Sequence, residues 1–190
     1  MGAGLIPFCV TGGRVGFLFQ KTFTGRKVGY LIDFGGGVAA GETCEQAAVR
    51  EFIEETETMF FAEDIRTAAR TPERIESQCR VMQALLDNTL RQHPDWWCQR
   101  EAGNRQPPRD WRTFFVEVAW RDVSGMNREW EQDDGKRFKK RRELLWVSAD
   151  ALHDLYENAP QRLWKRVRQL QGARETIRSI RDCMEGRDSR

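Results

Sequence analysis

A run of three glycines, followed at fixed spacing by a segment with helical periodicity, most constrains how this chain folds. Gly35-Gly36-Gly37 ends a β-rich opening, and Thr43 is a favourable residue for the position before a helix. Apolar residues then recur at helical spacing up to about Glu55: Ala47, Ala48, Val49, Phe52 and Ile53. The segment therefore predicts a strand, a glycine loop and an amphipathic helix that ends near Glu55.

Three carboxylates share the opposite face of this predicted helix. At 100° per residue, Glu51, Glu54 and Glu55 fall within about 100° of arc. Like charges at this spacing destabilise a bare helix by about 0.2–0.5 kcal/mol per pair, so a compensating cation is expected. Mg²⁺ prefers such oxygen ligands, and glycines let the backbone approach a metal or a phosphate closely. For the three glutamates alone, a solvated acidic face is the alternative interpretation.

The spacing of the whole stretch resembles the Nudix box of the Nudix hydrolase family. That pattern is glycine, five residues, glutamate, seven residues, then R-E-aliphatic-x-E-E-x-G-aliphatic, and six of its positions are met by Gly36, Glu42, Arg50, Glu51, Glu54 and Glu55. The chain departs from the pattern at Glu57, where the family has glycine, and at Thr58, where it has an aliphatic residue. Glycine suits a left-handed turn that closes the helix, so Glu57 is expected to strain that turn by roughly 1 kcal/mol, unless the helix closes differently.

The resemblance implies a fold and a site. The fold class is α/β (α+β), a Nudix-type α/β/α sandwich with a mixed β-sheet, here with a helical insertion and a C-terminal helix. The implied cofactor is Mg²⁺ (or Mn²⁺). Its implied ligands are Glu51, Glu54, Glu55 and the backbone at Gly36. Glu54 is also a candidate general base. Arg50 would orient the carboxylates, and Glu42 would complete the acidic cluster.

The remaining pattern predicts one domain over residues 1–184. We expect strands at Ile6–Val10, Val15–Gln20, Val28–Phe34, Trp111–Trp120 and Leu144–Val147. We expect helices at about 62–91, after Ser148, and from Pro160 to about Met184. Residues 92–110 and 122–136 are expected to be loops, so that 62–110 forms a helical and loop insertion, and 185–190 are expected to be a disordered tail.

Two downstream features are further candidates for the site. Glu143 precedes a predicted strand and is a candidate additional catalytic acid, with a surface charge as the alternative. The run Lys136–Arg142 holds six cations in seven positions. Four of its members are predicted to bind substrate phosphates: Arg137, Lys139, Lys140 and Arg142. A solvated basic loop is the alternative interpretation and is given equal weight. Four tryptophans in or near loops are candidates for stacking on a purine: Trp96, Trp97, Trp111 and Trp130.

These features favour a Mg²⁺-dependent pyrophosphohydrolase that cleaves a nucleoside diphosphate linked to another moiety. The order of residues from Pro107 to Arg112 and at Leu155-Tyr156 resembles the ADP-ribose branch of the family, so ADP-ribose-like substrates are favoured. Two alternatives stay open. One is a (deoxy)nucleoside triphosphate pyrophosphatase, and the other is a non-catalytic module that binds nucleotide or RNA through the basic run. Nucleic acid is the less favoured partner, and a homodimer formed through the final helix stays open.

Composition excludes several classes of protein. The chain is 39% hydrophobic and 32% charged, which is typical of a globular domain rather than a disordered or fibrous one. No apolar run approaches the roughly 20 residues of a membrane-spanning helix, and no signal peptide is apparent, so a cytoplasmic location is expected. The five cysteines contain no CxxC pair and indicate neither a disulfide framework nor a structural zinc site.

Overall fold

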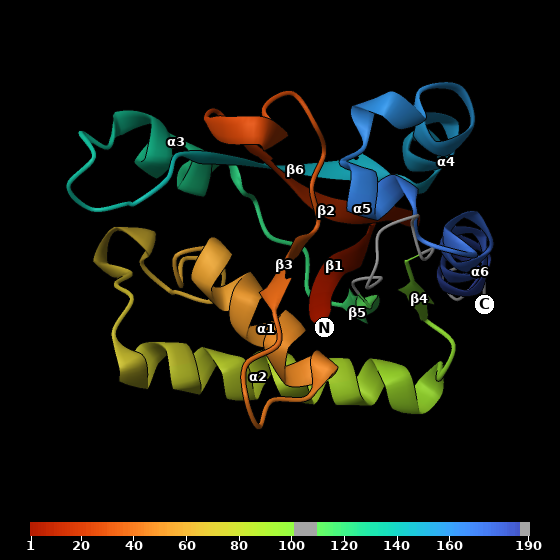
Figure 1. Ribbon diagram of the computed structural model, residues 1–190, viewed down its shortest axis with the longest axis horizontal. Helices are drawn as coiled ribbons and strands as arrows, with labels where there is room; N and C mark the ends of the chain where they lie inside the picture. The colour runs from red at the N-terminus through yellow and green to blue at the C-terminus, as the bar shows by residue number, and fades with distance from the viewer. Residues whose placement is uncertain (101–109, 187–190) are drawn as a thin grey trace.

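The computed structural model describes residues 1–100 and 110–186, which fold around a mixed sheet (Figure 1). The strands are β1 (Gly2–Thr11), β2 (Arg14–Thr22), β3 (Phe34–Gly37), β4 (Trp97–Gln99), β5 (Trp111–Glu117) and β6 (Arg142–Ser148). Their order is β4-β5-β1-β2-β6, with β3 paired to β1. Strand β1 is central because it pairs antiparallel with both β2 and β3 and parallel with β5.

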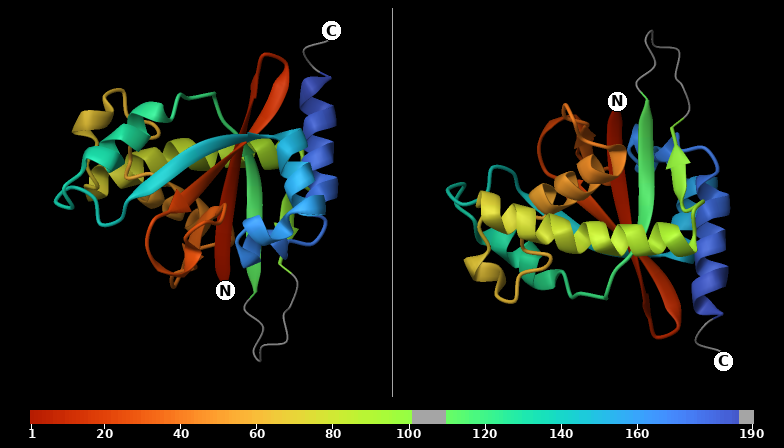
Figure 2. Two further views of the ribbon diagram at one scale, coloured as in Figure 1. Left: turned by 90° about the horizontal axis from the view of Figure 1, so that it is seen from above. Right: turned by 90° about the horizontal axis from the view of Figure 1, so that it is seen from below.

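Helices cover both faces of this sheet. They are α1 (Cys44–Glu55), α2 (Pro72–Gln92), α3 (Ser124–Gln132), α4 (Ala149–Asn158), α5 (Lys165–Arg168) and α6 (Ala173–Glu185). Figure 1 shows α1 and α2 on one side of the sheet and α4 and α6 on the other, and in Figure 2 the long helix α2 crosses β1 and β5. Two buried hydrophobic clusters lie on the two sides. The predicted fold class, a mixed sheet sandwiched between helices, is confirmed.

Helix α1 begins and packs as its sequence predicts. The Thr43 side chain accepts a hydrogen bond from the Gln46 backbone, and the Gln46 side chain accepts one from Thr43 in return. The five predicted apolar residues, Ala47, Ala48, Val49, Phe52 and Ile53, are all buried. Phe52 packs edge-on against Phe34 at 4.8 Å and Phe60 at 5.1 Å between ring centroids. An aromatic side chain at position 52 therefore anchors α1 to β3.

The turn that closes α1 is strained, as the replacement of glycine by Glu57 leads us to expect. Both Glu57 and Thr58 have left-handed backbones, with φ of 54° and 59°. A left-handed backbone conformation costs about 1–2 kcal/mol at a residue that has a Cβ. The surrounding structure holds the turn, because the Thr58 backbone donates to the Ile53 carbonyl at 3.0 Å and Gln78 donates to the Thr58 carbonyl at 2.8 Å. The strain is thus real and extends over two residues.

The predicted strand at Val28–Phe34 is wrong. Residues Gly25–Lys27 form a short 3-10 helix (η1), and Leu31 and Ile32 make only isolated bridges. Strand β3 instead starts at Phe34 and runs through the glycines. The reason is steric, because a Cβ on Gly35 would lie 2.3 Å from the Ala3 carbonyl oxygen. Only a run without side chains can approach β1 this closely.

The predicted loop at 122–136 is also wrong, because residues Ser124–Gln132 form α3. Met126 and Trp130 are four residues apart, and both are buried. This pair is a helical signal inside a charged segment. The Asp122 carboxylate accepts a hydrogen bond from the Ser124 backbone at 2.9 Å and so supports the start of the helix.

Three other predicted boundaries change. The helix expected over 62–91 begins only at Pro72, after a 3-10 turn (η2, Ile65–Thr67). The helix expected from Pro160 is broken into a 3-10 turn (η3, Pro160–Arg162), α5 and α6, because this segment turns to bury Leu163 and Val167. The strand expected to end at Trp120 ends at Glu117.

The other two segments that we expected to lack regular structure, 92–110 and 185–190, are partly ordered. Strand β4 extends the sheet inside the expected loop at 92–110, while residues 101–109 lie outside the described part. Glu185 belongs to α6 and accepts a hydrogen bond from the Val15 backbone at 2.9 Å, so the expected tail does not begin there. Residues 187–190 also lie outside the described part. Among the described helices, none is both long and apolar enough to cross a membrane.

Candidate active site

Arg50 connects the acidic residues of α1 to the glycine strand β3. Its guanidinium donates to Glu42 at 2.7 Å, to Glu51 at 2.9 Å and to the Gly37 carbonyl at 3.0 Å, and it lies 3.7 Å from Glu54. These hydrogen bonds hold the pKa of Glu42 below its usual value and raise the pKa of Arg50. The structure therefore brings Glu42, Arg50 and Glu51 together in one hydrogen-bonded group beside β3.

Glu51 lies directly against the backbone of Gly36. An ideal Cβ at Gly36 would fall 2.2 Å from Glu51 Oε1 and 2.6 Å from Oε2, so the carboxylate occupies the space that any other residue would fill. Burial raises the pKa of Glu51, while Arg50 opposes this rise and the neighbouring charges of Glu55 and Glu54 add to it. Position 36 must therefore be glycine for this carboxylate to sit where it does.

Glu55 is held where three strands meet. It accepts hydrogen bonds from Gln20 of β2 at 2.6 Å, from the Gly35 backbone of β3 at 2.9 Å and from Arg142 of β6 at 3.1 Å. Its side chain is 13% exposed. Of the predicted substrate-binding cations, Arg142 is thus the one that forms an ion pair with a predicted metal ligand.

Glu54 is the most exposed of the three carboxylates, with 29% of its side chain accessible. Its closest cation is Arg70, at 3.3 Å, which also lies 3.7 Å from Glu57. Sequence reasoning missed Arg70 because it follows the short turn after η2, with no motif around it. The residue reaches Glu54 only because this segment folds back against the end of α1.

The donors present suit a hard divalent cation, although they are not gathered into a metal cage. All are oxygen atoms, and the contact of Glu51 with Gly36 provides a cradle that a Cβ would fill. Within residues 1–100 and 110–186, no group of three or more His, Cys, Asp or Glu side chains is placed to hold a metal ion. Arg50, Arg70 and Arg142 instead each hold one or more of the carboxylates in ion pairs.

The basic run Lys136–Arg142 divides between two roles. Arg137 donates to Glu129 and to the carbonyls of Ile65 and Ala68, so it fastens its own loop to the segment after α1. Lys139 lines a pocket beside Glu57. Burial and the charge of Arg142 lower the pKa of Lys140, and the charge of Glu55 opposes this. Arg142 therefore contacts Glu55 and Lys139 lies beside Glu57, whereas Arg137 mainly supports structure.

Glu143 lies on the other face of β6. Neighbouring residues of a strand point to opposite faces, so Glu143 faces away from Arg142 and Glu55. It pairs with Lys21 across the sheet, at 3.9 Å, and 43% of its side chain is exposed. The structure does not bring Glu143 to the carboxylate face of α1.

A second pocket is lined by the glycine strand β3 and by residues of the segment Trp164–Arg166. This glycine-strand pocket has a cavity volume of about 500 Å³, and its lining includes Gly35–Gly37, Lys27, Arg100, Trp111, Trp164, Lys165 and Arg166. Of the tryptophans predicted to stack on a purine, Trp111 lies here, whereas Trp96 and Trp130 are only 1% exposed and belong to the core. Sequence reasoning missed Trp164 and Lys27, because distant segments bring them to the site.

A buried ion pair supports the wall of this pocket. Arg166 donates to the Asp33 carboxylate at 2.5 Å and to the Asp33 carbonyl at 3.0 Å, and its guanidinium lies 4.3 Å from the ring centre of Trp111. Asp33 is fully buried, and its carboxylate also accepts from Thr113 at 3.3 Å. Burial raises the pKa of Asp33, and Arg166 opposes that rise.

No protein-family model and no curated protein matches the chain. Among solved structures, it is similar to a Nudix hydrolase, RenU, from M. smegmatis (20% identity, 95% of this chain and 87% of that one, TM-score 0.49). It is also similar to an Ap4A hydrolase binary complex from C. elegans, with 14% identity over 98% of this chain and 99% of that one and a TM-score of 0.48. A third similar structure is a Nudix hydrolase from Alicyclobacillus acidocaldarius, with 13% identity over 96% of this chain and 90% of that one and a TM-score of 0.46. These identities and scores are too low to assign a family, so function is inferred from the chain's own residues.

Proposed function

We propose that this protein is a divalent-metal-dependent pyrophosphohydrolase that cleaves a nucleoside diphosphate linked to another moiety, with ADP-ribose-like substrates favoured. The observation that carries the proposal is the joint placement of Glu51, Glu54 and Glu55 on one face of α1, with cations on either side. Carboxylates alone would repel a diphosphate. Arg70 and Arg142 beside them supply the positive charge that a diphosphate needs.

The oxygen atoms of Glu51, Glu54, Glu55 and the backbone at Gly36 would hold Mg²⁺ or Mn²⁺. When bound, such an ion neutralises phosphoryl charge and lowers the pKa of a coordinated water. Glu54 is the most exposed carboxylate and is proposed to accept the proton of the attacking water. Attack at one phosphorus forms a P–O bond and breaks the bridging P–O bond, leaving a nucleoside monophosphate and the phosphorylated second moiety.

Arginines have a double role in this proposal. In the metal-free protein, Arg50, Arg70 and Arg142 compensate the carboxylates. Substrate phosphates offer Arg70 and Arg142 a competing anion, which favours release of Glu54 and Glu55 toward the metal. Lys139 and Lys140 precede Arg142 by three and two residues and are proposed to add to phosphate binding.

The glycine-strand pocket is proposed to bind the nucleoside. It combines aromatic surface from Trp111 and Trp164 with cations from Lys27 and Lys165. Aromatic side chains stack on bases, and cations near them suit the adjoining phosphates. Its lining includes Gly36, so a nucleoside bound there would place its phosphates beside Glu51.

A substrate panel tests the proposal. ADP-ribose, sugar nucleotides, dinucleoside polyphosphates and (deoxy)nucleoside triphosphates are incubated with Mg²⁺ or Mn²⁺, and release of phosphate or nucleoside monophosphate is followed. We expect metal-dependent cleavage of nucleoside diphosphates linked to a second moiety, with ADP-ribose among the best. Cleavage confined to triphosphates would replace this substrate class with the pyrophosphatase alternative.

One observation favours a non-catalytic alternative. All three carboxylates predicted to bind the metal are held by arginines, and no three acidic side chains of the described residues converge on one point. A module that binds nucleotide or RNA without cleaving it has no need for free carboxylates. Nucleotide binding without hydrolysis of any compound in the panel, under either metal, would support that alternative.

Gly36→Ala is expected to lower metal affinity and turnover by about 10–100-fold without unfolding the protein. The added methyl group would collide with the Glu51 carboxylate at 2.2 Å and push it away from Arg50. Gly37→Ala is the matched control, because nothing lies within 4 Å of the Cβ position there. Mn²⁺ binding by electron paramagnetic resonance and turnover are measured for both variants. Equal behaviour of the two would show that the Glu51 cradle has no role in metal binding.

A further inference from the structure

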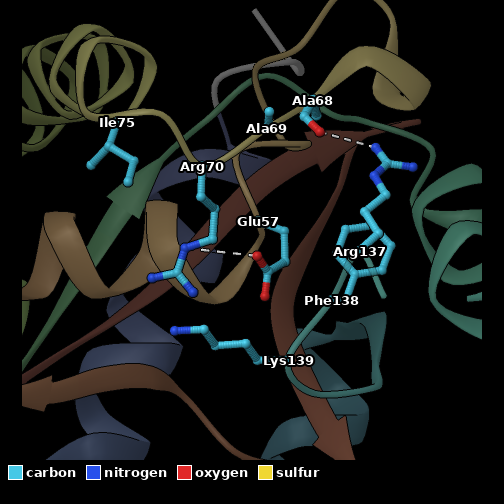
Figure 3. A pocket seen from close by; sticks show the side chains of 8 residues that line it. All are labelled: Glu57, Ala68, Ala69, Arg70, Ile75, Arg137, Phe138 and Lys139. Carbon is cyan, nitrogen blue, oxygen red and sulfur yellow. Dashed lines mark hydrogen bonds and ion pairs between the residues drawn. The ribbon is translucent and has the colours of Figure 1, made fainter. Parts of the chain in front are cut away.

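A pocket of about 400 Å³ lies beyond the C-terminal end of α1 and is separate from the glycine-strand pocket (Figure 3). We call it the Glu57 pocket. Its wall includes the apolar side chains of Ala68, Ala69 and Ile75. Figure 3 shows the side chains of Glu57, Arg70 and Lys139 directed toward one another within it. Arg70 connects it to the proposed active site, because its guanidinium lies 3.3 Å from Glu54.

Glu57 is held in this pocket at a cost that stability does not explain. The residue has a left-handed backbone, and its side chain is only 5% exposed. Glycine at this position would avoid both the backbone strain and the burial of a charge. The turn is nevertheless fixed on several sides, since Thr58 also donates from its hydroxyl to the Ala69 carbonyl at 3.1 Å. Strain maintained in this way beside a cleft is typical of a functional site.

The Glu57 carboxylate retains most of its capacity to accept hydrogen bonds. Within residues 1–100 and 110–186, its ion-pair partner is Arg70, at 3.7 Å, which is too far for a hydrogen bond. No other described residue donates a hydrogen bond to it. A carboxylate has about four acceptor positions, so a ligand in the pocket would find acceptors directed at it.

The charges of the pocket restrict what this ligand group can be. A cationic group would be repelled by Arg70, Arg137 and Lys139, and an anionic group would be repelled by Glu57. A neutral group with several hydrogen-bond donors is repelled neither by the cations nor by Glu57. Two hydroxyls on adjacent carbons match the two oxygens of one carboxylate, as in the recognition of ribose by an acidic side chain. The cations at the edge then suit the phosphate to which such a group is attached.

A nucleobase fits this pocket less well. Among the residues that the structure describes, Phe138 is the one aromatic side chain in its lining, and it is 6% exposed. The Arg137 guanidinium covers one side of that ring at 4.6 Å, and Trp130 packs beside it at 6.0 Å. The ring therefore has no free face for stacking. In the glycine-strand pocket, Arg166 covers one side of the Trp111 ring at 4.3 Å, so stacking there falls to Trp164.

We propose that the Glu57 pocket binds the sugar of the moiety that is attached to the nucleoside diphosphate, and that Glu57 determines specificity by accepting hydrogen bonds from its hydroxyls. This inference rests on the proposed function and deepens it. It assigns the nucleoside to the glycine-strand pocket, the diphosphate to the face of α1, and the sugar to the Glu57 pocket. Arg70 and Lys139 would contact the phosphate between α1 and the sugar.

Binding of two hydrolysis-resistant analogues tests the inference. The probes are α,β-methylene-ADP and α,β-methylene-ADP-ribose in the presence of Mg²⁺, titrated by calorimetry into the full-length protein. The wild type is expected to bind the ribose-bearing probe at least about tenfold more tightly than the ADP probe. In Glu57→Gln and Glu57→Gly this preference is expected to fall to about twofold or less, with the affinity for the ADP probe unchanged within about twofold.

Two controls keep the outcome clear. Glu73→Gln removes an exposed carboxylate of α2 outside the pocket and is expected to keep the wild-type preference. Glu57→Gly removes the backbone strain, so its melting temperature is expected to be no lower than that of the wild type. An unchanged preference in both Glu57 variants would overturn the inference and leave the proposed function standing. Equal binding of the two probes by the wild type would also overturn the inference and leave the proposed function standing. Binding of neither probe would overturn the inference and the proposed function together.

Discussion

Glu54→Gln is expected to lower the turnover number for metal-dependent hydrolysis by about 10²–10⁴-fold. The substitution keeps the size of the side chain but removes the charge that would hold a metal ion or accept a proton. Its effect on folding is expected to be small, because the pairs of Glu54 with Arg50 and Arg70 are partly exposed and such pairs contribute about 0–1 kcal/mol each. Turnover and melting temperature are measured together.

The matched control for this substitution is Glu76→Gln on α2. Glu76 is also a helical glutamate in an ion pair, with Arg80 at 2.6 Å, but it is exposed and outside both pockets. It is expected to keep full turnover. Full turnover in Glu54→Gln as well would remove Glu54 from the metal and base assignments. Glu55→Gln is a less direct test, because Gln20, the Gly35 backbone and Arg142 all bind that carboxylate.

Arg166→Ala is expected to reduce the free energy of unfolding by about 3–5 kcal/mol. It leaves Asp33, a fully buried carboxylate, without its cation. For a domain of this size, each kcal/mol corresponds to about 2–4 °C, so a fall in melting temperature of about 6–20 °C is expected. Arg168→Ala, an exposed arginine of the same short helix, is the control and is expected to change the melting temperature by less than about 2 °C.

The loss of unfolding free energy in Arg166→Ala is expected to be larger at pH 8 than at pH 5. Burial already raises the pKa of Asp33, and removal of Arg166 takes away the largest influence that opposes this rise. A group whose pKa is higher in the folded than in the unfolded state binds its proton more tightly when folded, so stability falls as the pH rises through that range. The other charges that act on Asp33, Lys27 and Glu55, remain in the variant. Urea unfolding at pH 5 and pH 8 is compared with that of the wild type. An equal loss at both pH values would contradict a buried, charged Asp33.

The local part of the site could be predicted from the sequence. Thr43 and the periodic apolar residues of α1 predict where this helix begins and which face it buries, because helical neighbours are three and four residues apart. The same spacing places Glu51, Glu54 and Glu55 together. Glu57 in the place of glycine also predicts the strain that the structure shows at φ of 54°. In each case the interacting residues lie within one or two turns of the chain.

The contacts that complete the site depend on tertiary structure. Arg142 and Glu55 are 87 residues apart, and Arg166 and Asp33 are 133 apart. Their encounter depends on the register of β2 with β6 and on how the segment from η3 to α6 packs against β3, and both join residues far apart in the chain. The failed prediction at Val28–Phe34 has the same origin, because close packing against β1 decides which residues form β3. The sequence alone thus determined α1 and its acidic face, through interactions between near neighbours. The arginines that compensate that face, and the two pockets, were decided by packing between segments far apart in the chain.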